Sequence, residues 1–535
     1  MTTTAMSTLG TESSDDAVDL SIDGHSMTVD DVVRVACRPG EVRLSLAADA
    51  ERRMQRSDDL KRALIDTGVP IYGVTSGFGD SNTRQIGAAR SGTLQRNLIR
   101  FLSCGTGIHA NADVARATMI VRANCLARGH SGVRPEIVTT LLDCLDHDIL
   151  PLIPEQGSVG ASGDLVPLSY VAALITGEGD VLHAGVQRPA REALADCGIT
   201  PLVLVAKEGL GLVNGTSFMS AFASLALHDA TELVYAAELC TALTSSVLLG
   251  NPDHFTAFLF EQKPHRGTLD SAEQIAELIG DSGLVRTGIT GLSADGFRQL
   301  EEPIQDRYSI RCAPHVIGVL RDTISWAREW LDIEINSSND NPLFDAETGL
   351  VRNGGNFYGG HVGQAMDALK TAAASVADLL DRQLELVVDE KFNNGLTPNL
   401  IPSFEPGDPE EGLHHGFKGM QIAASSLTAE ALKNTMPATS FSRSTEAHNQ
   451  DKVSMGTIAA RDARTVVELS GRVAAIHLLA LTQAADLRGP ACLGQALEAA
   501  RRTVRSQSLT VDGDRPLASD IERIADLIRS GGLRG

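Results

Sequence analysis

No Cys-X-X-Cys pair occurs in this sequence, whose eight cysteines lie at positions 37, 104, 125, 144, 197, 240, 312 and 492. These scattered positions show neither a zinc-binding spacing nor a disulfide framework, which favours the reducing cytoplasm. Basic residues are also scarce, because 46 Lys and Arg face 68 Asp and Glu and leave a net charge of −22. Such a chain repels phosphate backbones and anionic lipid, so we expect no nucleic-acid and no membrane partner. No metal-binding, nucleotide-binding or phosphate-loop motif occurs, and none of these cofactors is expected.

The sequence also lacks an apolar segment of the kind that targets or spans membranes. Residues 1–19 are rich in Thr, Ser and Asp, which predicts a disordered leader rather than a signal peptide. The most apolar long stretch, residues 218–249, is interrupted by four ionisable residues between positions 228 and 238. Those charges favour a buried bundle helix over a membrane span.

Hydrophobic periodicity divides the rest of the chain. Residues 20–215 alternate short helical runs with Gly-rich loops, whereas residues 216–490 contain long helical patterns and residues 491–535 form a short C-terminal helical segment. No internal repeat is visible. The long candidate helices are Phe218–Leu249, Ala313–Leu331, Val362–Val388, Met420–Met436 and Met455–Ala485. Helices of this length exceed the globular average and predict an all-α fold with an elongated central bundle behind a mixed, loop-rich N-terminal domain.

A Gly-rich run in the N-terminal domain carries the most distinctive chemistry. It reads Ile153-Pro-Glu-Gln-Gly-Ser-Val-Gly-Ala-Ser-Gly-Asp-Leu-Val-Pro-Leu-Ser169, with Ala161-Ser162-Gly163 at its centre. In a compressed backbone, the amide nitrogen of Gly163 can attack the carbonyl carbon of Ala161. Loss of two waters then gives a five-membered imidazolone in which Ser162 becomes a methylidene. Glycine must supply the nitrogen, and small neighbours permit the strain; taken alone, Ala-Ser-Gly is a common flexible turn.

The whole run resembles the prosthetic-group signature of the aromatic amino acid ammonia-lyases and aminomutases. In that family the group is 4-methylidene-imidazol-5-one (MIO), and the resemblance extends from about Leu20 to Arg488. It implies an all-helical fold of the fumarase/aspartase-like superfamily, a small aromatic amino acid as substrate, and a homotetramer whose active sites combine loops from several subunits. The Gly-Ser-Ser-x-Met-Pro loop of fumarase-like lyases is absent, which argues against that branch of the superfamily.

Further family motifs follow in order. Tyr72, in Tyr-Gly-Val-Thr-Ser-Gly-Phe-Gly, resembles the residue that removes the β-proton, although a loop-anchoring aromatic would look the same. Asn214, in Asn-Gly-Thr, resembles the residue that orients the MIO carbonyl, and a helix cap is its alternative role.

Two downstream runs resemble the substrate-binding segments of the family. In Gln305-Asp-Arg-Tyr308-Ser-Ile-Arg311, Arg311 is expected to clamp the substrate carboxylate, Tyr308 to lie near the amine or the methylidene, and Gln305 to line the site. In the polar runs at 336–342 and 353–357, the resemblance implies that Asn339 helps bind the carboxylate and that Phe357 packs beside the MIO ring.

Four positions bear on the substrate side chain. Phe101 and Leu102 occupy the family's selectivity position, where histidine and tyrosine lyases usually carry His, so an apolar pair favours an unsubstituted phenyl ring. Gln450 stands where histidine ammonia-lyases have a Glu that pairs with imidazole, and Glu446 stands where phenylalanine ammonia-lyases have a Glu near the amine. The alternative interpretations are that Phe101 and Leu102 are core residues and that Glu446 is part of a helix N-terminal turn.

Together these residues predict a phenylalanine ammonia-lyase that forms MIO from Ala161-Ser162-Gly163 and releases trans-cinnamate. Tyrosine or histidine ammonia-lyase and phenylalanine 2,3-aminomutase are the alternatives within the family. A catalytically dead helical scaffold is the alternative outside it.

Overall fold

Helices make up most of the molecule, and the short strands seen in its described part all lie before residue 353. The computed structural model describes residues 18–286, 296–297, 299–300, 303–489 and 492–534. The all-α prediction is confirmed. Residues 1–17 of the predicted leader lie outside the described residues, and Val18 and Asp19 begin strand β1.

The chain divides into two units that do not follow sequence order. The first unit contains Met1–Ala221, Asp332–Gly359 and Arg443–Ser454, and the second contains Phe222–Leu331, Gly360–Ser442 and Met455–Gly535. Residues 332–359 and 443–454 fall within the domain expected at 216–490, yet their contacts place them in the first unit. Both segments carry predicted site residues, so the first unit gathers that chemistry from three stretches of chain.

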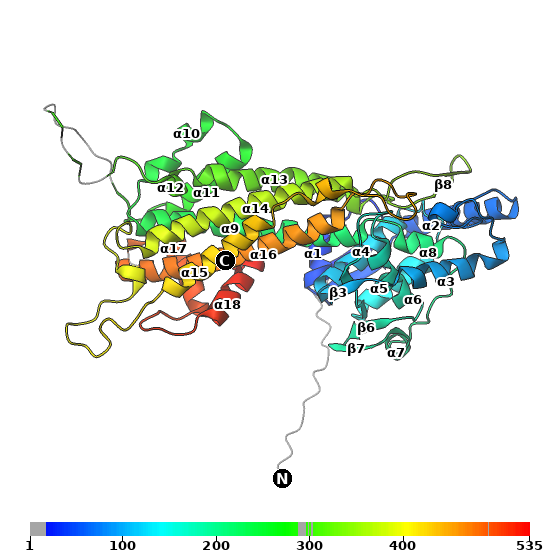
Figure 1. The fold of residues 1–535 in the computed structure, drawn as a ribbon, viewed down its shortest axis with the longest axis horizontal. Coiled ribbons are helices and arrows are strands. Elements are labelled where there is room, and N and C mark those ends of the chain that lie inside the picture. The colour runs from blue at the N-terminus through cyan, green and yellow to red at the C-terminus, as the bar shows by residue number, and fades with distance from the viewer. Residues whose placement is uncertain (1–17, 287–295, 298, 301–302, 490–491, 535) are drawn as a thin grey trace, which may run out of the picture. The chain divides into compact units, whose positions relative to one another are not determined.

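The first unit combines short helices with small two- and three-stranded sheets (Figure 1). Its helices are α1 (Val29–Cys37), α2 (Ala48–Asp66), α3 (Ser91–Leu102), α4 (Ala112–Ala127), α5 (Pro135–Asp146), α6 (Leu165–Ile175), α7 (Ala190–Asp196) and α8 (Glu208–Val213). Its strands are β1 (Val18–Ile22), β2 (Val42–Leu46), β3 (Thr106–His109), β4 (Leu150–Pro151), β5 (Pro154–Gln156), β6 (Asp180–His183), β7 (Val186–Pro189), β8 (Leu343–Asp345) and β9 (Leu350–Arg352). Strands β1 and β2 pair in parallel, whereas β3–β5, β4–β6–β7 and β8–β9 pair antiparallel.

The second unit is built from the long helices (Figure 1). They are α9 (Ser217–Val247, which starts in the first unit), α10 (Ala257–Glu261), α11 (Arg266–Ile279), α12 (Tyr308–Arg311), α13 (Ala313–Ile335, which ends in the first unit), α14 (Gly360–Val388), α15 (Lys418–Lys433), α16 (Gly456–Arg488), α17 (Gln495–Gln507) and α18 (Ala518–Arg529). Helices α14, α15 and α16 pack on one another. The five long helices predicted from periodicity are therefore present, each with ends shifted by a few residues.

The apolar side chains of α14 are buried, from Ala365 through Leu369 and Val376 to Leu384. Two charged residues of this helix, Asp367 and Lys370, are buried as well. The Lys370 ammonium donates to the carbonyl of Met436 (2.7 Å) and lies 2.9 Å from the Asp367 carboxylate. A 3.6-residue pattern cannot anticipate such an ion pair, whose two charges compensate each other inside the bundle.

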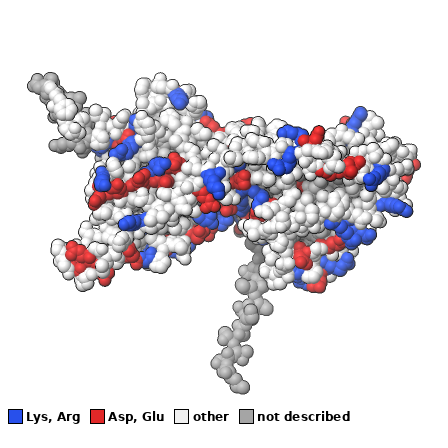
Figure 2. Space-filling view, in the orientation of Figure 1, with Lys and Arg blue, Asp and Glu red and all other residues white. Residues whose placement is uncertain are grey.

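Helix α16 is long and apolar enough to cross a membrane by length and composition, but 78% of its most apolar window is buried inside the fold. Since α14, α15 and α18 contact it, α16 has the packing of a core helix. On the face of the molecule shown in Figure 2, basic and acidic side chains are interspersed, and no continuous basic surface covers the described part of that face.

Candidate active site

A cavity of about 800 Å³ in the first unit collects most of the residues predicted to carry chemistry. The predicted residues that line it are Tyr72, Phe101, Leu102, Ala161, Ser162, Gly163, Asn214, Phe357, Glu446 and Gln450. They come from segments nearly 380 positions apart in the sequence. The resemblance thus identified residues that the fold brings to one place.

The Gly157–Gly163 loop forms the floor of the cavity in a strained conformation. Ser162 has φ of +52° and Gly163 has φ of +76°, both in the left-handed region that side chains disfavour. A Cβ atom on Gly163 would lie 2.1 Å from the carbonyl oxygen of Gly215, so only glycine fits. The adjacent amide of Asp164 donates to that same oxygen (2.7 Å) and fixes the end of the turn.

Two amide side chains hold Ser162 from opposite ends of the residue. Nδ2 of Asn214 donates to its carbonyl oxygen (2.8 Å), and Nε2 of Gln450 donates to its hydroxyl oxygen (2.9 Å). Asn214 follows the last residue of α8, and its backbone amide bonds to the carbonyl of Leu210. Its side chain is therefore used on the loop and not as an N-cap of α9, which begins three residues later.

Tyr72 and Glu446 both accept hydrogen bonds from backbone amides of the loop around Gly79. The Tyr72 phenol oxygen accepts a hydrogen bond from the Gly79 amide (2.8 Å), and the Glu446 carboxylate accepts one from the Asp80 amide (3.0 Å). Burial raises the pKa of Tyr72, the Gly79 hydrogen bond lowers it, and the charge of Glu446 raises it further. A phenol in this setting needs positive charge from elsewhere before it can ionise near neutral pH.

Apolar side chains from α3 form one wall of the cavity. Leu98 and Leu102 are buried, while Phe101 is 60% exposed in the isolated chain. Phe357 and Tyr358 line the cavity from the loop after β9. An aromatic ring without polar substituents suits such a wall, because the α3 side chains offer it no hydrogen-bonding partner.

Gln305, Tyr308 and Arg311 do not line this cavity and belong to the second unit. Tyr308 is 72% exposed, and the Arg311 guanidinium lies 4.4 Å from the centre of its ring. Nε of Arg311 donates to the backbone carbonyl of Asp306 (3.0 Å).

The structure does not support the role expected of Asn339. Its side chain is fully buried, donates to the Thr216 hydroxyl (2.7 Å) and the Cys125 sulfur (3.3 Å), and does not line the cavity. Asn341, two residues later, lines the cavity instead. The sequence showed several asparagines in one polar run but not which of them faces the cavity.

Sequence reasoning also missed a buried layer beneath the loop. Asp164 accepts hydrogen bonds from the Ser158 hydroxyl (2.9 Å) and the Met219 amide (2.8 Å). Asp164 directly follows Gly163, and this adjacency was the signal available in the sequence. Within the described residues, no group of three or more His, Cys, Asp or Glu side chains is arranged to hold a metal ion.

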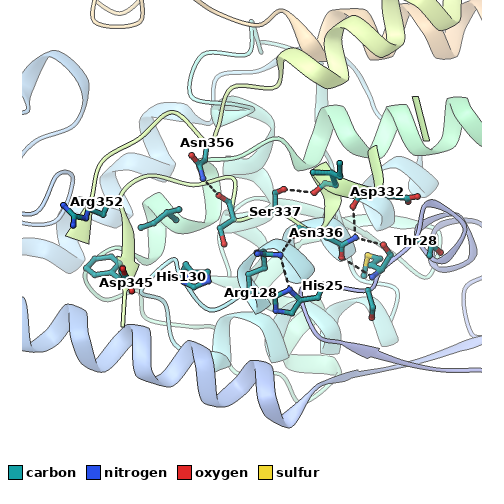
Figure 3. A pocket seen from close by; sticks show the side chains of 16 residues that line it. His25, Thr28, Arg128, His130, Asp332, Asn336, Ser337, Asp345, Arg352 and Asn356 are labelled. Atoms are coloured by element: carbon teal, nitrogen blue, oxygen red, sulfur yellow. Dashed lines mark hydrogen bonds between the residues drawn. The ribbon is translucent and has the colours of Figure 1, made fainter. Parts of the chain in front are cut away.

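A second hollow in the first unit, of about 910 Å³, contains none of the predicted residues (Figure 3). Its polar side chains are largely bonded to one another or to the backbone: a terminal nitrogen of Arg128 contacts Nδ1 of His25 (3.1 Å) and donates to the carbonyl of Asn336 (2.6 Å). The cavity over Ser162 is therefore the better candidate, although it is slightly smaller.

Known proteins resemble this chain over nearly its whole length. The family model for aromatic amino acid lyases matches residues 27–506. The chain is 40% identical to a histidine ammonia-lyase of Gloeobacter violaceus (96% of each chain) and 39% identical to an "MIO-dependent tyrosine 2,3-aminomutase" of Streptomyces globisporus (96% of this chain, 95% of the relative). The structure of the Pantoea agglomerans phenylalanine aminomutase matches with a TM-score of 0.89 and 31% identity, over 96% of this chain and 99% of that one.

Overall identity does not single out phenylalanine enzymes, since histidine and tyrosine enzymes match at 40% and 39%. The similarity nevertheless extends over almost the whole of both chains, and the residues matched by the family model, 27–506, include the strained loop, Asn214 and Gln450. This chain belongs to the aromatic amino acid lyase family.

Proposed function

We propose that this protein forms MIO from Ala161-Ser162-Gly163 and eliminates ammonia from L-phenylalanine to give trans-cinnamate. The observation that carries the proposal is the left-handed turn at Ser162 and Gly163, which lies in a cavity with Asn214 bonded to the Ser162 carbonyl. The other residues in this proposal are assigned by the chemistry that each can perform.

The loop fits the cyclisation that MIO requires. The new bond joins the Gly163 nitrogen to the Ala161 carbonyl carbon, whose oxygen leaves as one water, and the Ser162 hydroxyl leaves with its α-hydrogen as the second. Gly163 lacks the side chain that would block this approach, and the contact with Gly215 holds it in place. Strain of this kind persists only where the surroundings impose it, as the buried neighbours do here.

The MIO group supplies an electron-poor methylidene that no ordinary side chain offers. Asn214 holds the carbonyl oxygen next to it through Nδ2. Tyr72, once ionised, removes the β-proton of the substrate and becomes a neutral phenol, while the amine departs as ammonia. We assign the substrate carboxylate to Arg311 of a second subunit, because Arg311 of the same chain does not line this cavity, and Asn341 takes the role expected of Asn339.

Phenylalanine is proposed because the residues around the substrate ring are neutral or apolar. Leu98, Phe101 and Leu102 present only carbon, and Gln450 provides no charge for an imidazole. A buried polar group left unpaired costs about 1–3 kcal/mol, which disfavours imidazole or phenol against this wall. The second candidates are a histidine ammonia-lyase and a tyrosine aminomutase reaction, because enzymes with these activities are 40% and 39% identical to the chain.

Assembly into a homotetramer is part of the proposal. Helix α15 exposes Ile422 (68%), and the chain just after it exposes Met436 (65%), so the second unit carries uncovered apolar side chains. A second subunit would cover them and could also bring Arg311 to a cavity. Light scattering of the purified protein tests the subunit number.

The decisive experiment measures intact mass, absorbance and products together. We expect the purified chain to be lighter by two waters and to absorb in the near ultraviolet, and Ser162→Ala to lose both properties. Parallel assays with phenylalanine, tyrosine and histidine should show phenylalanine as the best substrate. Cinnamate with free ammonia identifies a lyase, and β-phenylalanine identifies a mutase. A folded chain of full mass would leave only an inactive scaffold.

A further inference from the structure

A fully buried arginine lies directly beneath the Asn214–Thr216 segment. Arg122, on α4, is 0% exposed, and one terminal nitrogen of its guanidinium donates to the Asn214 carbonyl (3.1 Å) and to Oδ1 of Asn339 (3.3 Å). A Cβ atom on Gly215 would lie 1.9 Å from that same nitrogen. The guanidinium therefore packs against the backbone at Gly215 with no room between them.

This arginine is incompletely satisfied. Its Nε and its second terminal nitrogen are buried without a hydrogen-bond partner, and no carboxylate of the described residues lies within 4.0 Å of it. Other buried cations of the same unit are paired, as Lys207 is with Asp340 (2.6 Å) and Lys61 with Asp58 (2.5 Å). A buried charge with vacant donors costs stability. Since stability gives no reason for this arrangement, a functional reason is the better explanation.

The three residues of the segment are each fixed by a different contact. Arg122 holds the Asn214 carbonyl, the Asp164 amide holds the Gly215 carbonyl (2.7 Å), and the Thr216 hydroxyl donates to Glu334 (2.5 Å). Asn339 links the first contact to the third, because it accepts from Arg122 and donates to Thr216. Arg122 is the only cation in this set.

We propose that Arg122 is a positioning residue that acts through Asn214. It fixes the Asn214 backbone so that Nδ2 stays on the Ser162 carbonyl, and its charge lies two hydrogen bonds from that oxygen. The inference rests on the proposed function, in which this oxygen shares the electrons drawn toward the methylidene. An interaction that strengthens as charge develops lowers the barrier without strengthening substrate binding.

The experiment compares Arg122→Gln with Arg116→Gln in the full-length protein. Arg116 is on the same helix α4 and is largely buried, but it pairs with Asp148 (2.7 Å) and does not line the cavity. Intact mass gives the fraction of chains that have lost two waters, and kcat and KM for phenylalanine are expressed per dehydrated chain. Asn339→Ser serves as a second variant, because it removes the other acceptor of the Arg122 guanidinium.

We expect Arg122→Gln to lower kcat per dehydrated chain by at least about tenfold relative to Arg116→Gln, with KM within threefold, because one oriented donor is worth about 10²–10³ in kcat. Asn339→Ser should lower kcat at least threefold in the same way, and it decides the question if Arg122→Gln does not fold. A kcat within threefold of the control, or a loss confined to KM, overturns the inference. A wild-type chain of full mass instead removes the proposed function itself, so the two failures are distinguishable.

Discussion

Replacing Glu334 by Gln tests whether the buried layer beneath the loop carries an electrostatic cost. Glu334 lies at the end of α13, and its carboxylate accepts the Thr216 hydroxyl. Burial raises the pKa of Glu334 from 4.5 to about 6, the Thr216 hydrogen bond lowers it, and the charge of Asp164 raises it. Glutamine keeps an oxygen that can accept from Thr216 but never carries the charge.

The sign of the effect follows from proton binding. Because the folded state binds the proton of Glu334 more tightly than the unfolded state, stability falls as pH rises from about 4.5 to about 6 and the cost is then constant. At 1.36 kcal/mol for each pKa unit, that cost is about 2 kcal/mol above pH 6. The free energy of unfolding of Glu334→Gln minus that of wild type should therefore rise by roughly 1.5 kcal/mol between pH 4.5 and pH 8.

Urea denaturation at these two pH values measures the difference in the free energy of unfolding. Glu329→Gln, an exposed carboxylate on the same helix, is the matched control and should show no such growth. If Glu334→Gln has the same effect on stability at both pH values, the carboxylate is not penalised by burial and the reasoning fails.

Three further changes test the candidate site itself. Gly163→Ala should abolish the loss of two waters, because its Cβ would meet the Gly215 carbonyl at 2.1 Å, and a dehydrated variant in the mass spectrum would contradict this. Gln450→Glu should raise the ratio of kcat/KM for histidine to that for phenylalanine at least about tenfold, since a carboxylate can pair with imidazole, and an unchanged ratio would refute it. Glu446→Gln should lower the pKa of Tyr72 because it removes a negative charge, so the rise of kcat/KM with pH should move to lower pH. A pH profile that does not move, or moves to higher pH, would exclude the effect of Glu446 on Tyr72.

The sequence determined which elements form and which chemistry is available. The buried stripe of α14 and the lengths of α9 and α16 follow from apolar periodicity, because a helix must turn its apolar residues toward a core. The Ala161-Ser162-Gly163 run was identifiable from its Gly-rich setting and its resemblance to the family signature, because Ala-Ser-Gly alone is a common turn.

Tertiary structure alone decided what faces the cavity. Asn339 and Asn341 are the same residue type two positions apart, yet one is buried in hydrogen bonds and the other lines the cavity. Arg122 has no distinguishing feature in the sequence, and its importance comes from contacts with residues 92 and 217 positions away. The local sequence pattern indicates how a segment buries its own apolar surface. The direction of a polar side chain depends instead on partners that only the folded chain brings within hydrogen-bonding distance.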